Sequence, residues 1–158
     1  MKSDKTKGLS RRGFFRAAGA GAVAAAGVSL APAAANADAA KTAAAINKVL
    51  GGATAKDGRI KMKTPIIAEN GGVVPVIVSV DSPMTDGDYV KSVSLFVENN
   101  PNPDVATFHF TPASGVAEVK VNLRMAKTSP VVAVAVMSDG SAYQARKDIK
   151  VTIGGCGG

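Results

Sequence analysis

The chain has 158 residues, of which 46% are hydrophobic, and this length leaves room for one domain of ordinary size. Its net charge of +7 comes largely from the first 37 residues, which hold six of the 19 basic residues and one of the 12 acidic residues. The remainder has thirteen basic and eleven acidic residues, so it lacks the basic surface that nucleic-acid binding requires. The single cysteine excludes a disulfide bond within the chain.

Residues 1–37 have the pattern of an export signal. Arg11 and Arg12 form a pair that is followed by Phe14 and Phe15, and a stretch rich in alanine and glycine then runs over residues 17–30. Small residues at 35–37 offer a cleavage site. A membrane anchor fits less well, because this stretch is interrupted by glycine and is short of the ~20 apolar residues that a span needs. We therefore expect a cleaved twin-arginine signal, a periplasmic protein and no membrane attachment after cleavage.

A short helix is expected after the signal, over Ala39–Leu50. Ile46, Val49 and Leu50 follow the helical spacing i, i+3, i+4, and the two glycines at 51 and 52 end the pattern. A helix with one apolar face must bury that face. We therefore expect it to pack on the domain as a cap.

From Arg59 onward the hydrophobic residues alternate with polar ones, which is the period of half-buried β-strands. The clearest alternating runs are residues 74–80, 93–97, 107–110, 118–125 and 149–153. Turn-forming residues separate the runs, as at Asn70-Gly71-Gly72 and Ser138-Asp139-Gly140. Six to eight short strands of this kind predict an all-β fold, an immunoglobulin-like antiparallel β-sandwich over residues 38–153.

Two features depart from the alternating pattern. Val131–Met137 is apolar on both faces, and Phe96 points away from the row formed by Val93, Leu95 and Val97. A strand that is apolar on both faces of a two-layer fold needs something to cover its second face. Either the N-terminal helix or a loop lies over it, or the strand forms a subunit interface.

The last five residues, 154–158, surround Cys156 with Gly154, Gly155, Gly157 and Gly158. Because glycine has the greatest backbone freedom, we expect a flexible, slender arm whose sulfur ranges over roughly 10 Å beyond the last strand. No base is expected beside the thiol, since His109, the sole histidine, lies in a strand pattern and is expected at the surface. An unactivated, mobile thiol suits a group on which other proteins' active sites act.

The terminal run Val151-Thr152-Ile153-Gly154-Gly155-Cys156-Gly157-Gly158 resembles the SoxY family of sulfur-oxidation carriers, whose distinguishing motif is a C-terminal GGCGG. The similarity extends over most of the chain after the signal, and the twin-arginine leader is in keeping with it. The further similar stretches are residues 68–71, 78–84, 99–103, 107–112 and 137–140.

This resemblance implies an immunoglobulin-like domain that pairs with the SoxZ subunit as a heterodimer. It also implies that Cys156 is the covalent attachment point for sulfur intermediates of thiosulfate oxidation. A haem enzyme would join thiosulfate to the cysteine as an S-thiosulfonate, a hydrolase would release sulfate and leave a persulfide, and a sulfane dehydrogenase takes part in some organisms. The chain would then be a non-catalytic carrier without a cofactor or a metal.

Two other readings of the tail remain. The chain could be an immunoglobulin-like periplasmic module in which Cys156 forms a permanent disulfide with another chain. A thiol peroxidase or disulfide oxidoreductase fits poorly, because those enzymes use cysteines fixed at helix ends or in C-x-x-C motifs.

Overall fold

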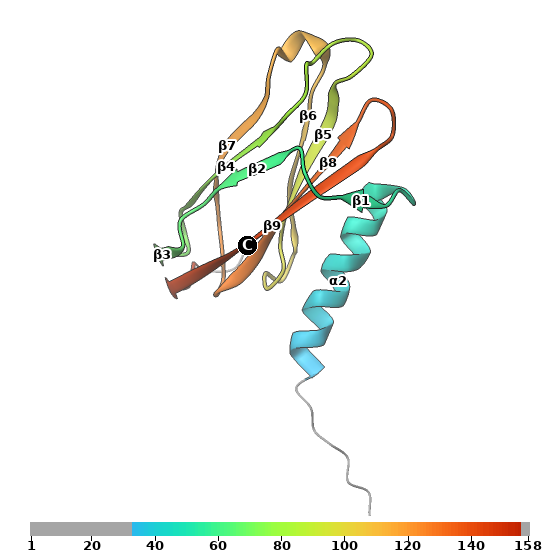
Figure 1. Ribbon diagram of the computed structural model, residues 1–158. Coiled ribbons are helices and arrows are strands. Elements are labelled where there is room, and N and C mark those ends of the chain that lie inside the picture. Colours follow the sequence, from blue (N-terminus) through green and yellow to red (C-terminus); the bar gives the residue numbers. More distant parts are fainter. Residues whose placement is uncertain (1–32, 156–158) are drawn as a thin grey trace, which may run out of the picture. The chain divides into compact units, whose positions relative to one another are not determined.

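The computed structural model describes residues 33–155, and their side chains from residue 39 onward (Figure 1). The predicted export signal with Arg11 and Arg12 therefore lies outside the described residues, apart from the end of its small-residue stretch. Cys156, Gly157 and Gly158 also lie outside them.

Nine strands form two sheets in the described part of the chain. Neighbouring strands pair antiparallel, except that β1 and β3 each pair with β9 in parallel. The larger sheet has the order β1-β9-β8-β5-β6, with β3 also on β9, and consists of β1 (Ala55–Lys56), β3 (Ile67–Asn70), β5 (Val90–Val97), β6 (Asp104–His109), β8 (Ser129–Met137) and β9 (Ala142–Ile153). The smaller sheet has the order β2-β4-β7 and consists of β2 (Ile60–Lys63), β4 (Val74–Val80) and β7 (Ala117–Leu123). A 3-10 turn, η1 (Pro112–Ser114), precedes β7.

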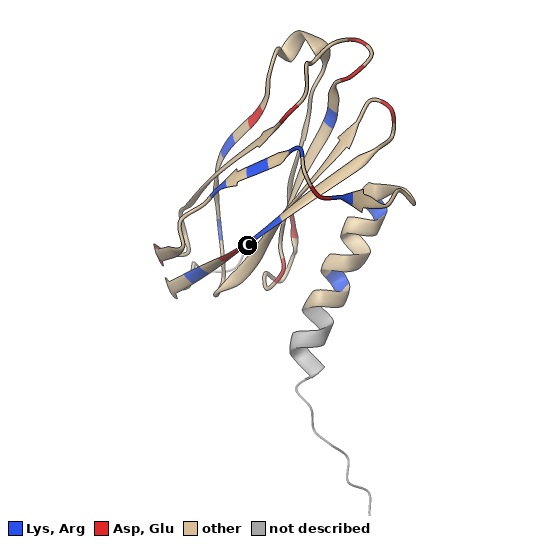
Figure 2. Cartoon of the chain, viewed as in Figure 1, with Lys and Arg blue, Asp and Glu red and all other residues tan. Residues whose placement is uncertain are grey.

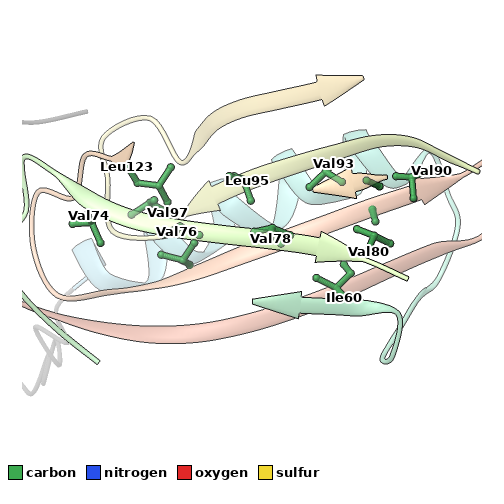
Figure 3. Packing of buried hydrophobic residues seen from close by; sticks show 14 of the residues in the cluster. Ile60, Val74, Val76, Val78, Val80, Val90, Val93, Leu95, Val97 and Leu123 are labelled. Atoms are coloured by element: carbon green, nitrogen blue, oxygen red, sulfur yellow. The ribbon is translucent and has the colours of Figure 1, made fainter. Parts of the chain in front are cut away.

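The predicted all-β sandwich is confirmed, and its core lies between the two sheets. Val74, Val76, Val78 and Val80 of β4 are buried, as their alternation predicts, and they face buried residues of β5 (Figure 3). Full burial of one such side chain contributes about 1.5–3 kcal/mol. The two parallel pairings with β9 were not expected, because the sequence pattern of a short edge strand does not record which neighbour it joins.

The N-terminal helix, α2 (Ala33–Leu50), begins six residues earlier than expected and includes residues 35–37, where the cleavage site is predicted. Its packing comes from its C-terminal half, where Ala45, Ile46, Val49 and Leu50 contact the larger sheet. Loss of the first helical turn at the predicted cleavage site would therefore leave these contacts in place.

The helix covers the second face of β8. Phe96, Val132 and Val134 form a separate buried cluster with the apolar face of α2, on the opposite side of the larger sheet from β2, β4 and β7 (Figure 1). Val134 is fully buried and Val132 is 4% exposed. Of the two explanations for this doubly apolar strand, the helix cap is correct. These residues therefore offer no exposed surface to a second subunit.

Charged residues of both signs are spread over the strands and loops (Figure 2). They form a few surface ion pairs, such as Arg59 with Asp88 at 3.0 Å and Lys61 with Asp81 at 2.9 Å. Pairs this exposed contribute little to stability. Within the described residues, no helix is long and apolar enough to cross a membrane.

Candidate functional site at the C-terminal tail

The predicted carrier tail begins where β9 ends, and a neighbouring strand pairs with β9 as far as its last residue. Residues 142–149 pair with β8, and residues 150–153 pair with β3 on the other edge. On the β8 side, the Thr128 hydroxyl accepts a 3.0 Å hydrogen bond from the Val151 N–H. The strand therefore reaches the tail as fixed backbone.

From the last residue of β9 onward, two backbone hydrogen bonds link the chain to two other segments, and a third bond joins those segments to each other. The Gly71 N–H donates to the Ile153 carbonyl at 2.7 Å, and the Met125 N–H donates to the Gly71 carbonyl at 2.7 Å. The Gly155 N–H then donates to the Met125 carbonyl at 3.0 Å. These bonds close a ring through Gly71, Met125, Gly155 and Ile153, which we call the tail clamp.

The clamp packs so closely that three of its positions have no room for a side chain. A Cβ atom on Gly71 or Gly154 would lie within 3.0 Å of the carbonyl oxygens of Met125 or Ala126, respectively. A Cβ on Gly155 would lie 2.5 Å from the Gly72 nitrogen. Such distances to backbone atoms are not found for real Cβ atoms, so this crossing of chain segments requires glycine.

Here the structure differs from the expected flexible arm over residues 154–158. Gly154 and Gly155 were assigned to that arm because glycine has high backbone freedom, but both are packed against fixed backbone. The reason is that the absence of Cβ permits close approach of chains as well as flexibility. Cys156, Gly157 and Gly158 lie outside the described residues, so their part of the expectation stays a prediction.

The loop that holds the tail is itself held by Asn100, which lies in the stretch 99–103 that is similar to the family. The Asn100 side chain is 2% exposed. Its amide nitrogen donates to the Arg124 carbonyl at 2.8 Å, and its oxygen accepts from the Ala126 N–H at 3.0 Å. Met125, between these two residues, is fully buried. A run of Asn and Pro signals a loop, but it gives no sign that one amide is buried.

His109 is the last residue of β6. The expectation that no base lies beside the thiol rests on the position of this sole histidine. It is exposed, and it pairs with Ser92 near the start of β5. The tail clamp lies beyond the other end of β5, near Asn100. Ser92 and Val97 alone are separated by roughly 17 Å of strand at ~3.3 Å per residue. His109 is therefore placed as expected, at the surface and away from the end of β9.

The surface around the clamp is partly apolar and carries charges of both signs, among them the exposed Glu69 of β3. Ile153, directly before Gly154, is 68% exposed, and Val73, directly after Gly72, is 58% exposed. Arg124 and Lys150 are also exposed in this region. Among the described residues, no group of three or more His, Cys, Asp or Glu side chains could hold a metal ion.

Comparisons with known proteins give one family. The chain matches the family described as "Sulfur oxidation protein SoxY" over residues 46–156. It is also similar to the solved structure of the sulfur carrier protein SoxY from Chlorobium limicola f thiosulfatophilum. The two are 36% identical with a TM-score of 0.62, and the match covers 73% of this chain and 99% of that one. The comparison with curated proteins gave no match.

Superoxide reductases share the fold but little sequence. The neelaredoxin from Ignicoccus hospitalis is 24% identical with a TM-score of 0.54, over 60% of this chain and 80% of that one. The enzyme from Nanoarchaeum equitans is 10% identical with a TM-score of 0.51, over 61% of this chain and 98% of that one. Likeness at this level concerns the arrangement of strands alone.

Proposed function

The chain belongs to the SoxY family of sulfur oxidation proteins, and we propose that it carries the sulfur intermediates of thiosulfate oxidation covalently on Cys156. The observation that supports this most directly is the position of the thiol. Cys156 is the single cysteine, and it follows Gly155, the last residue held by the tail clamp. The thiol therefore belongs to the residue that directly follows the clamped Gly155.

The proposed loading step joins thiosulfate to the cysteine oxidatively. The Cys156 Sγ loses its proton and forms a bond to the sulfane sulfur of thiosulfate, which gives an S-thiosulfonate. Two electrons leave in this step, and a haem enzyme accepts them. His109, the sole histidine, pairs with Ser92 away from the end of β9, so we expect the partner enzyme to activate the thiol.

The proposed release step is a hydrolysis. Water attacks the sulfonate sulfur, the bond between the two sulfur atoms of the thiosulfate unit breaks, and sulfate leaves; of the two protons of the water, one goes to the persulfide sulfur and one to solvent. Cys156 keeps one extra sulfur as a persulfide. No electrons are exchanged in this step, so a hydrolase suffices, and a sulfane dehydrogenase would be needed only for further oxidation of the remaining sulfur.

Partner and location belong to the same proposal. Family membership supports pairing with a SoxZ subunit and transient contacts with the enzymes named above. The twin-arginine pattern at Arg11 and Arg12 supports export to the periplasm. The surface for SoxZ must lie outside the Phe96, Val132 and Val134 cluster, because α2 occupies that face.

The test is intact-mass analysis of the protein purified from its native source, before and after a thiol reductant. We expect species heavier than the unmodified chain by one sulfur atom or by one thiosulfate unit, and the reductant should remove both additions. Cys156→Ser should lack them and should abolish growth on thiosulfate with an unchanged melting temperature. Retention of growth on thiosulfate by Cys156→Ser would refute the carrier function. An added mass the size of a second protein, lost on reduction, would favour the permanent disulfide.

A further inference from the structure

The tail clamp brings together three segments that are distant in sequence. They are the turn after β3, the loop after β7 and the end of β9, joined by the ring of hydrogen bonds described above. Each bond joins two backbone groups, so the pattern of side chains in the sequence does not predict the clamp. Backbone groups that are paired in this way exchange more slowly than free ones, and Gly71 and Met125 of the clamp are buried as well.

Gly71 is the residue on which the ring depends. Its N–H and its carbonyl make two of the three hydrogen bonds, and it is buried. A Cβ atom at this position would lie within 3.0 Å of the Met125 oxygen, the Gly155 nitrogen and Val151 Cγ1. The backbone of Gly71 does not have a positive φ. Close approach of the tail, and not an unusual backbone conformation, is therefore what requires glycine here.

We propose that Gly71 is a positioning residue, which anchors the tail at Gly155 so that the cysteine next in the chain is presented from one fixed point. With consecutive Cα atoms 3.8 Å apart, Cys156 Sγ stays within about 7 Å of the Gly155 Cα. A tail that is free from Ile153 onward would add two residues, or about 7 Å more reach. The anchor thus lowers the volume that the sulfur samples by about eightfold.

This restriction matters for recognition by a second protein. A thiol presented from a fixed point loses less conformational entropy on entering an active site than one on a longer free arm. The role in sulfur transfer rests on the proposed function of Cys156. The anchoring of Gly155 does not rest on it, since only the described residues are involved.

The experiment uses the full chain and two readouts, neither of which requires sulfur chemistry. The first is amide hydrogen exchange of Gly155, with the amide of the buried Ile149 as a reference for β9. The second is the mobility of a nitroxide attached to Cys156, the single cysteine. Gly71→Ala should speed Gly155 exchange by about tenfold or more and sharpen the nitroxide spectrum, while Ile149 exchange stays unchanged.

Gly87→Ala is the matched control, because a Cβ on Gly87 meets no atom within 4 Å and its backbone lacks a positive φ. It should leave both readouts unchanged. Gly155→Ala is the second test variant, since a Cβ there would meet Gly72 but its position past β9 keeps it out of the core. It should mobilise the nitroxide even if Gly71→Ala fails to fold.

Unprotected Gly155 exchange in the unaltered protein would overturn the proposal, and so would a nitroxide spectrum that neither variant changes. With the sulfur-loading enzyme, Gly71→Ala should raise the KM for the carrier and leave kcat nearly unchanged. Labelling by a small thiol reagent should stay normal. If Cys156→Ser retains sulfur-oxidising activity while the exchange results hold, the proposed function fails and the anchor remains.

Discussion

The side-chain amide of Asn100 donates a 2.8 Å hydrogen bond to the carbonyl of Arg124 from a position that is almost fully buried. The same side chain accepts a bond from Ala126, so one residue supports the loop whose middle residue, Met125, holds the tail. The support of the tail thus extends from the end of β9 back to the loop after β5.

Asn100→Ala should destabilise the domain and loosen the tail together. Loss of the amide leaves the part-buried Arg124 carbonyl and Ala126 N–H without their partner, which costs up to about 1–3 kcal/mol each where water cannot replace it. Urea denaturation should therefore show a lower midpoint with an unchanged slope. Asn102→Ala is the control, because Asn102 is exposed in the same loop, and it should stay within about 0.5 kcal/mol. Equal midpoints for the two variants would contradict this assignment.

Phe96→Ala should destabilise the contact between α2 and the larger sheet. The side chain, on β5, is fully buried and packs with Val132 and Val134 of β8 against the helix, so its removal leaves a cavity and should cost about 3–5 kcal/mol. Thermal unfolding followed by circular dichroism measures this loss. Val116→Ala, at a position that is 69% exposed, should change stability by less than about 0.5 kcal/mol. A small effect of Phe96→Ala would mean that the helix does not pack on this face in solution.

Asp139, in the hairpin between β8 and β9, should titrate with a lowered pKa. Hydrogen bonds from the Ser141 hydroxyl and N–H lower the pKa of Asp139 below its ordinary value of 3.8. Because the pKa of Asp139 is lowered in the folded state, its ionised carboxylate stabilises the fold. This contribution to the free energy of unfolding is fully present above pH 3.8 and is lost as the pH falls through the lowered pKa. In an NMR titration, Ser141→Ala should move the pKa of Asp139 up toward its ordinary value. An unchanged titration curve would rule out the hydroxyl as the main cause.

Replacement of Arg11 and Arg12 by lysine should keep the precursor in the cytoplasm, because the twin-arginine machinery reads the arginine pair. Cell fractionation followed by immunoblotting measures the distribution. Arg16→Lys keeps the pair and has the same change of side chain, so it should be exported normally. Periplasmic accumulation of the Lys-Lys variant would refute the twin-arginine assignment.

The sequence by itself determined the parts of this protein that depend on local pattern. Alternation at Val74–Val80 gave a buried strand, the spacing of Ile46, Val49 and Leu50 gave a packed helix, and the terminal motif gave the family. Only the tertiary structure decided that α2 covers β8 and that Gly154 and Gly155 are clamped. The physical reason is that an apolar face does not specify its partner. A glycine likewise looks the same in the sequence whether it makes a chain flexible or lets another backbone occupy the space that a Cβ atom would need.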